Sequence, residues 1–448
     1  MDFRSFIQKL EKDGCLIKIE KQVSKKFEAA AILKALDGKP VLFEKIKESN
    51  FKVAGNIFSS KQYIAKYFGG KEQDLIKIMV KALNNPKKLK VAKKGPCQEV
   101  IIDEENIDLD KLPILRHTKI DGGNYITSGV FVARDKELGM NASFHRCMQL
   151  DKKTFSVRVC ERNLYEFLQR AGGELNVAVC VGNPASVLLA GATSPPVGEF
   201  EFEIASALER FEVVKSAFAD VYVPSSSEFI IEGTLTMNEL ADEGMFLDLT
   251  GTRDFIRKQP ILKVKRITHR RNAIWHALLP GGNEHGLLMG MPREPTIFTE
   301  VSKFAKCKNV NITQGGCSWL HAVVQIQKEN DEQVKKVIEA AFKGHSSLKH
   351  VFVVDEDINA NDMQEVEWAF ATRFQGDKQM HVFPKQKGSS LDPSAEQPSR
   401  LTCKIGFDLT VPSNKDKLDF KKVSYERINI SKYLVKKDEV KQRRKRIS

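Results

Sequence analysis

Residues 139–162, with the sequence GMNASFHRCMQLDKKTFSVRVCER, predict two β-strands joined by a turn. Side chains of alternating character run from Met140 to Met148, Asp151-Lys152-Lys153 supplies the turn, and residues 154–160 return. Strict alternation places one set of side chains on one face (Asn141, Ser143, His145) and another on the opposite face (Phe144, Arg146). A surface hairpin carries such polar groups at no cost, so this pattern alone assigns no function.

The composition is that of a globular protein. The chain has 448 residues, 42% hydrophobic and 29% charged, which predicts two or three domains. No apolar signal follows Met1, and the most apolar run, residues 177–192, is interrupted by Gly182-Asn183-Pro184. The eight cysteines show no CxxC pair and no zinc spacing, which favours buried thiols in a reducing compartment, although Cys147 and Cys160 could also be reactive. We therefore expect a cytoplasmic protein with no membrane partner.

The net charge of +13 raises nucleic-acid binding as a function. Much of the excess lies in residues 86–94 (PKKLKVAKK) and 436–446 (KKDEVKQRRKR). Neither segment has the interleaved aromatic residues that a base-stacking surface needs. Solvated faces and a basic tail explain both segments, so we expect no nucleic-acid partner.

The order of predicted elements indicates three domains. Residues 1–100 alternate helices and short strands, as in a small α/β domain, with Phe3, Phe6, Ile7 and Leu10 at helical spacing. Residues 101–310 form a barrel-like β domain of many short strands. Its predicted strands are 100–102, 128–133, 139–148, 155–160, 177–181, 187–189, 220–223, 228–235, 261–268 and 273–279. Residues 311–448 follow a βαβ-like pattern (strands 320–327 and 350–354, helices 332–342 and 362–373) and end in a basic helical tail.

Glu201 stands out in the helix predicted over residues 199–211, because it falls on the flank of the apolar stripe. A carboxylate there lies either at the rim of the protein or partly buried and paired. In the second case a hard cation is a natural partner, and a glutamate with an asparagine carbonyl suits manganese or magnesium better than zinc.

Glu243 and Asp248 are expected in a glycine-punctuated loop, residues 242–251. They are either exposed loop charges or are shielded by residues 245–247. Shielding would raise one pKa until a carboxylic acid can donate a proton near neutrality. The sequence contains no phosphate-binding loop of the P-loop or dinucleotide type and no GxSxG elbow.

These scattered residues together resemble one family, the UbiD-type decarboxylases. The matching pieces are Asn141-x4-Arg146, Arg158, Glu201 ahead of a small-residue helix, Glu243-x4-Asp248 and Lys404-Ile-Gly-Phe-Asp408. The resemblance covers nearly the whole chain and implies a flavin-binding split β-barrel between two α/β regions. It also implies prenylated FMN from a flavin prenyltransferase, a divalent metal that is usually manganese, often potassium, and a homo-oligomer. The family adds or removes carboxylate groups on α,β-unsaturated or aromatic acids, with the cofactor as electron sink.

The resemblance implies a role for each matching residue. Asn141 and Glu201 correspond to metal ligands. The cofactor-binding positions are Asn141, Phe144, His145, Arg146, Arg158, Val159, Cys160, Asn163 and Lys404. Arg146, Glu243 and Asp248 correspond to a catalytic acid–arginine–acid network in which Arg146 orients the substrate carboxylate through two hydrogen bonds and Asp248 donates the proton. This arrangement requires a bulge or strand end between Asn141 and Arg146. Several relatives have a histidine metal ligand where Arg162-Asn163 stand, so the third ligand is not assigned.

The substrate is indicated by the segments NASFHR and ATSPP (residues 192–196), which resemble the archaeal branch of the family. The implied reaction is decarboxylation of trans-anhydromevalonate 5-phosphate to isopentenyl phosphate in the archaeal mevalonate route. An aromatic hydroxyacid decarboxylase of the 4-hydroxybenzoate type is the alternative, and a basic nucleic-acid-binding protein is a remote one. The sequence assigns no basic residue to a substrate phosphate.

Overall fold

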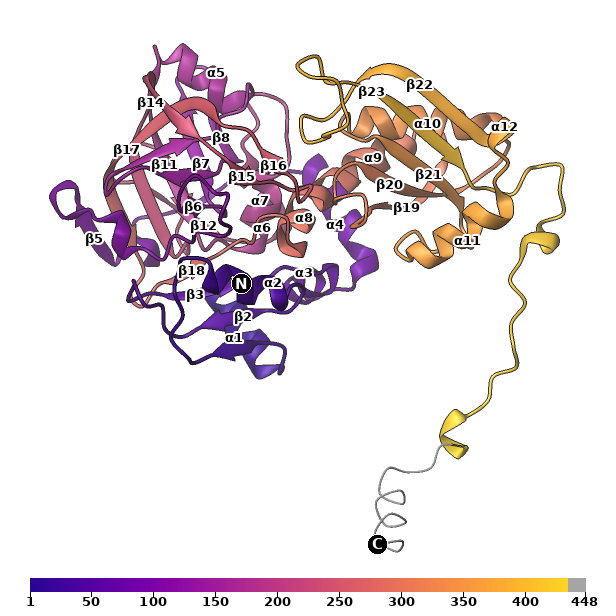
Figure 1. The fold of residues 1–448 in the computed structure, drawn as a ribbon, viewed down its shortest axis with the longest axis horizontal. Coiled ribbons are helices and arrows are strands. Elements are labelled where there is room, and N and C mark those ends of the chain that lie inside the picture. The colour runs from indigo at the N-terminus through magenta and orange to yellow at the C-terminus, as the bar shows by residue number, and fades with distance from the viewer. Residues whose placement is uncertain (434–448) are drawn as a thin grey trace, which may run out of the picture. The chain divides into compact units, whose positions relative to one another are not determined.

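A computed structural model gives the fold and describes residues 1–433 (Figure 1). Residues Met1–Thr410 form one compact unit and Val411–Ser448 a second. The described part of the second unit contains two short 3-10 turns, Lys417–Phe420 and Ile430–Lys432. The predicted basic tail over residues 436–446 lies outside the described residues. None of the described helices combines the length and apolar composition that a membrane span requires.

The N-terminal region is a four-stranded sheet with helices, as predicted. The sheet order is β1 (Ile17–Ile19), β2 (Val41–Phe43), β3 (Lys52–Gly55) and β18 (Ile274–His276). The helices are α1 (Phe3–Lys12), α2 (Glu28–Ala35), α3 (Lys61–Phe68) and α4 (Leu75–Asn84). Helix α1 begins where the Asp2 side chain accepts the Ser5 N–H, and it buries the predicted stripe. The assignment of residues 273–279 to the barrel was wrong: β18 pairs in parallel with β3, and its wholly buried pattern did not reveal which sheet it joins.

A curled nine-stranded sheet is the largest sheet within residues 1–433 (Figure 1). Its order is β6 (Tyr125–Ile126), β9 (Cys147–Gln149), β10 (Thr154–Val157), β17 (Arg257–His269), β14 (Phe229–Glu243), β11 (Glu174–Val181), β7 (Val130–Asp135) and β8 (Gly139–Phe144), with β5 (Val100–Asp103) on β17. Strand β8 ends the path at one side and β9 is next to last at the other, yet only His145 and Arg146 separate them in sequence. The three Cα–Cα steps from Phe144 to Cys147 span at most about 11 Å, so the sheet must curl until its ends meet without pairing. The predicted split β-barrel is confirmed.

Two predictions within the barrel region were wrong, and one helix was predicted too long. Residues 187–189 lie in helix α6 (Ala185–Gly191), not in a strand. All seven residues of α6 are buried, so it shows no amphipathic period. Residues 220–223 contribute β13 (Tyr222–Pro224) to a separate sheet with β12 (Glu212–Lys215) and β4 (Lys90–Ala92). The helix expected over 199–211 is the shorter α7 (Glu201–Leu208). The remaining elements here are α5 (Asn163–Arg170) and the small ribbon of β15 (Phe246–Leu247) and β16 (Arg253–Asp254).

The C-terminal region confirms the βαβ pattern. Its sheet order is β19 (Lys306–Ile312), β20 (His321–Gln327), β21 (His350–Asp355), β23 (Leu401–Asp408) and β22 (Met380–Lys387). Strands β20, β21 and β23 are parallel, and the helices are α9 (Glu294–Val301), α10 (Glu332–Gly344), α11 (Met363–Arg373) and α12 (Gly376–Gln379). Helix α8 (Asn283–Gly290) precedes α9 in the chain. The domain boundaries at residues 100 and 310 stay a proposal.

Candidate active site

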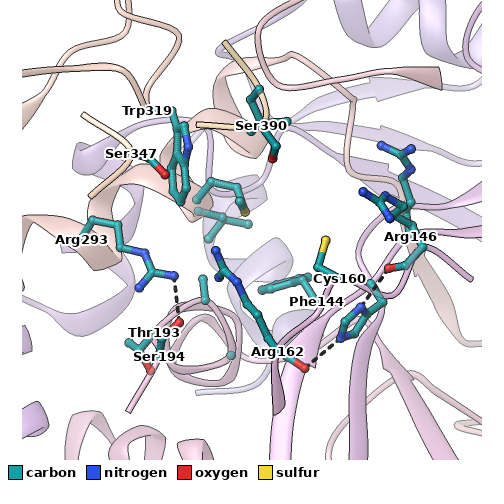
Figure 2. Close-up of a pocket in the computed structure, with 18 of the residues that line it drawn as sticks. Phe144, Arg146, Cys160, Arg162, Thr193, Ser194, Arg293, Trp319, Ser347 and Ser390 are labelled. Atoms are coloured by element: carbon teal, nitrogen blue, oxygen red, sulfur yellow. Dashed lines mark hydrogen bonds between the residues drawn. The ribbon is translucent and has the colours of Figure 1, made fainter. Parts of the chain in front are cut away.

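A cavity of about 630 Å³ opens between the barrel, helices α6 to α8 and the loops that follow α10 and β22. Figure 2 shows part of its lining, with Arg146 and Arg293 on opposite sides. Most of the predicted site residues line it: Asn141, Phe144, His145, Arg146, Arg158, Cys160, Asn163, Glu201 and Asp248. Asn141 and Arg146 can face the same cavity because the strand is interrupted between β8 and β9. The interruption frees Arg146 from the alternation that would turn its side chain away from Asn141. The sequence-distant residues thus converge.

Three predicted residues do not line the cavity. Glu243 lies directly behind Arg146. Val159 packs into the barrel core, and its N–H donates to Gln259 Oε1 (2.9 Å). The Lys404 ammonium donates to the Ser346 carbonyl (2.5 Å), so it lies one residue back from the cavity wall, and burial lowers its pKa to about 8.

Arg146 is held by three carboxylates. Its Nε and Nη2 donate to the two oxygens of Glu243 (2.8 and 3.0 Å), Nη1 donates to Asp248 Oδ2 (2.7 Å), and Nη2 donates to Asp254 Oδ2 (2.7 Å). The guanidinium also lies over the Phe246 ring at 4.6 Å. Burial disfavours the charge on Arg146, but the hydrogen bonds to Glu243 and the nearby carboxylates raise its pKa. The predicted acid–arginine–acid contacts are therefore present, with Asp254 as an additional member.

The sequence predicted Glu243 in a loop, but Glu243 is the last residue of β14. Bulges in β14 carry the strand on to Glu243, which pairs with Arg257 and is completely buried. Asp248 follows β15, and its Oδ1 accepts the Leu249 N–H (2.6 Å). His285 of α8, which the sequence did not single out, also lines the cavity. Burial lowers the pKa of His285 against the opposing charge of Asp248.

Asn141 and Glu201 meet at the base of the cavity. Asn141 Nδ2 donates to Glu201 Oε1 and the Ala142 N–H to Oε2, both at 2.7 Å. Glu201, the first residue of α7, is 2% exposed, so the rim placement considered from sequence is wrong. Burial raises the pKa of Glu201 to about 7, even though hydrogen bonds from Ala142 and Asn141 favour the charged form. A cation at this carboxylate would relieve that cost.

The oxygens of Asn141 and Glu201 fit a hard divalent ion. Within residues 1–433, no group of three or more His, Cys, Asp or Glu side chains could enclose a metal. An ion here would therefore take its remaining ligands from bound phosphate or water, as magnesium and manganese do. The neighbouring Ser143 hydroxyl bonds Asn141 Oδ1 and His145 Nε2, both at 3.0 Å, which ties His145 to the same polar group.

Arginines and a buried histidine form the opposite wall. Arg293 donates to Ser194 Oγ (3.1 Å) and its guanidinium lies 5.8 Å from the centre of the Trp319 ring. His345 Nε2 contacts the Trp319 carbonyl (3.2 Å). Burial, followed by the charges of Arg293, Lys404 and Arg162, lowers the pKa of His345 to about 3. The sequence did not identify this wall.

We expect the ligand-free protein to lose stability as the pH falls below 6.5, partly through His345. Its pKa is lower in the folded than in the unfolded state, so the unfolded state binds the extra proton. One such group changes the free energy of unfolding by at most about 1.4 kcal/mol per pH unit. In urea denaturation at pH 7, 6 and 5, the free energy of unfolding should fall less steeply with pH for His345→Gln than for wild type. An unchanged slope would contradict a neutral buried imidazole.

Family models match three consecutive parts of the chain. The 3-octaprenyl-4-hydroxybenzoate carboxy-lyase N-terminal domain matches residues 7–83, the Rift-related domain 89–283 and the C-terminal domain 286–409. The chain belongs to the UbiD family. The predicted family membership and carboxy-lyase activity are thus confirmed.

Individual relatives and solved structures also place this chain in the UbiD family. An anhydromevalonate phosphate decarboxylase of Methanocaldococcus jannaschii is 42% identical over 90% of this chain and 95% of its own length, and one of Methanosarcina mazei is 41% identical over 92% and 96%. The solved structure of the UbiD-class enzyme HmfF from Pelotomaculum thermopropionicum in complex with FMN has a TM-score of 0.93 and 33% identity, covering 97% of this chain and 100% of that one. An evolved dimeric form of HmfF in complex with prFMN has a TM-score of 0.88, again with 33% identity and covering 97% of this chain and 100% of that one.

Proposed function

We propose that the protein decarboxylates trans-anhydromevalonate 5-phosphate to isopentenyl phosphate and CO₂ with the help of prenylated FMN. The observation that carries this proposal is the cavity itself, which places an arginine with acidic partners opposite a cationic wall. A substrate with a carboxylate at one end and a phosphate at the other matches both walls. The relatives named anhydromevalonate phosphate decarboxylase support the same substrate.

The cofactor and metal are assigned to the residues that fit them. Asn141 and Glu201 would hold a divalent ion, proposed to be Mn²⁺, whose charge would help to retain the phosphate of the cofactor. Potassium is part of the same proposal. We assign the contacts with the cofactor to the predicted residues that line the cavity: Phe144, His145, Arg146, Arg158, Cys160 and Asn163. Val159 and Lys404, which the family pattern also implied, lie behind that lining. When bound, the modified flavin supplies an electron sink for the pair left by departing CO₂. The FMN and prFMN complexes of HmfF support a flavin in this cavity.

Arg146 and Asp248 carry the proton chemistry in this proposal. Four hydrogen bonds from Arg146 go to carboxylates, so one of its five N–H groups is free for the substrate. The two-point contact expected from the family pattern therefore requires Asp248 to release Nη1. A protonated Asp248 binds Arg146 less strongly, so proton loading and carboxylate binding favour one another. After the C–C bond breaks, Asp248 gives its proton to the carbon that carried CO₂, and solvent restores it.

The decisive test uses protein co-expressed with a flavin prenyltransferase. We expect it to purify with a modified flavin and an equimolar divalent metal, and to release CO₂ and isopentenyl phosphate from trans-anhydromevalonate 5-phosphate. 4-Hydroxybenzoate serves as the comparison acid. Release of CO₂ from 4-hydroxybenzoate alone would move the assignment to the aromatic acids. We also propose a homo-oligomer, which sedimentation of the same preparation would measure.

A further inference from the structure

The two sides of the cavity differ in charge. Around Arg146, the carboxylates outnumber the arginines even when Arg257, which pairs with Asp254 at 2.7 Å, is counted. The rest of the lining contains one carboxylate, Glu201, and several cations (Arg158, Arg162, Arg293 and Lys343), with Lys404 behind Ser346. A phosphate dianion and a divalent metal add no net charge. The proposed cofactor therefore leaves a surplus of positive charge on this side.

Arg162 and Arg293 form the core of this surplus. Their guanidinium groups extend toward the same space in Figure 2. Within residues 1–433, neither forms an ion pair with a carboxylate, and the Nε of Arg293 is buried without a hydrogen-bond partner. Burial, with a further contribution from Arg162, lowers the pKa of Arg293 to about 10. Two facing cations, with Arg293 half-buried and Arg162 exposed, repel each other unless an anion lies between them.

A phosphate monoester is the anion that suits this pair. Guanidinium groups bind phosphate oxygens through paired N–H donors, and two of them match a dianion in charge. Ser347 and Ser390 lie beside the same space and can add hydroxyl donors (Figure 2). Lys404 is committed elsewhere, because its ammonium donates to the Ser346 carbonyl and lies over the Phe342 ring at 5.2 Å.

We propose that Arg162 and Arg293 form the binding subsite for the phosphate of a phosphomonoester substrate, across the cavity from Arg146 and Asp248. This rests on the proposed function for the identity of the acid, but the subsite itself is a separate claim. It explains how the enzyme selects a phosphorylated acid: the phosphate is fixed at one wall, and the carboxylate then reaches the other. The competing role for the pair is to hold the cofactor phosphate.

The first test measures substrate selection by the flavin-loaded enzyme. Arg162→Gln and Arg293→Gln should each lower kcat/KM for the phosphorylated acid about 10- to 100-fold, mainly through KM. Slow turnover of the same acid without its phosphate should not change. Arg293→Lys should recover part of the loss. Flavin per protein, read from the absorbance spectrum, should match wild type; a variant that loses flavin would assign the pair to the cofactor phosphate and overturn the proposal.

A second test does not depend on decarboxylation. Calorimetry on the holoenzyme should show binding of 3-methylbutyl phosphate, an unreactive monoester. Its affinity should be about 10-fold or more lower in both glutamine variants. 3-Methylbutanol should not bind. If the monoester binds in this way but no acid is decarboxylated, the proposed function fails and the subsite stands. Equal affinity in wild type and variants would overturn the subsite.

Lys343→Gln is the matched control for charge. Lys343 lies at the rim of the same side, its ammonium is 3.1 Å from Glu300, and it is exposed. Removing its charge should change monoester affinity less than about 3-fold, since an exposed pair contributes little. A loss as large as that in Arg162→Gln would show a general field effect in place of direct contact. Arg162 is itself exposed, so its replacement tests the subsite even if Arg293→Gln does not fold.

Discussion

In the flavin-loaded enzyme, Asp248→Asn is expected to lower kcat by about 10²- to 10⁴-fold, the usual contribution of a general acid. Asparagine keeps the shape of the side chain and can still accept the hydrogen bond from Arg146 Nη1. It has no acidic proton to give to the carbon that loses CO₂. Flavin and metal contents should remain those of wild type, because Asp248 lies apart from Asn141 and Glu201. Single-turnover CO₂ release measures the chemical step directly.

Asp254→Asn is the matched control for this prediction. Asp254 accepts a hydrogen bond from the same arginine at the same 2.7 Å, and it also pairs with Arg257. Its loss should disturb the position of Arg146 and cost about 10-fold, well below the loss of a proton donor. Wild-type turnover in Asp248→Asn would remove Asp248 from the mechanism. An inactive Asp254→Asn beside an active Asp248→Asn would make Asp254 the donor.

Local patterns in the sequence predicted most elements, but not where they meet. The stripe of α1 follows from side-chain period alone, whereas β7 and β14 are mostly continuous apolar runs that are recognised by their β-branched residues and by the turns that bound them. The convergence of Arg146, Glu243 and Asp248 came from resemblance to a family, because no local rule links residues about 100 positions apart. Strict alternation of side chains along the strand even placed Arg146 on the face opposite Asn141. The short break at His145 and Arg146 resolves the conflict, since the pleat does not continue across it.

The residues missed by sequence reasoning share a physical reason. His285 and Arg293 lie on α8 and the short 3-10 turn Met291–Arg293, where neighbouring glycine and proline residues weaken the helical pattern of the sequence. Asp254 pairs in a two-residue ribbon too short to show a period. Their roles depend on tertiary neighbours such as Trp319 and Arg146. A count of unpaired cations, possible only with coordinates, is the signal that reveals the Arg162–Arg293 wall.

Glu201→Gln is expected to remove metal and flavin together. Both Glu201 oxygens point into the polar group formed with Asn141 and Ala142, and glutamine removes the negative charge that Glu201 offers to a divalent ion beside the neutral Asn141 amide. Metal and flavin per protein should each fall at least about 10-fold after co-expression with the prenyltransferase. Plasma emission spectroscopy and the flavin absorbance measure the two. Glu199→Gln is the control, because Glu199 is exposed two positions earlier and should bind both normally.

The ligand-free proteins separate this loss from unfolding. Burial raises the pKa of Glu201 from 4.5 to about 7, so the folded state holds a proton that the unfolded state releases. The carboxyl therefore costs the folded state stability as the pH rises from 4.5 through 7, and glutamine does not. Without cofactor, Glu201→Gln should melt no lower than wild type at pH 8. A lower melting temperature would mean that the lost flavin reflects damage to the fold, and full flavin with full metal would exclude Glu201 as the ligand.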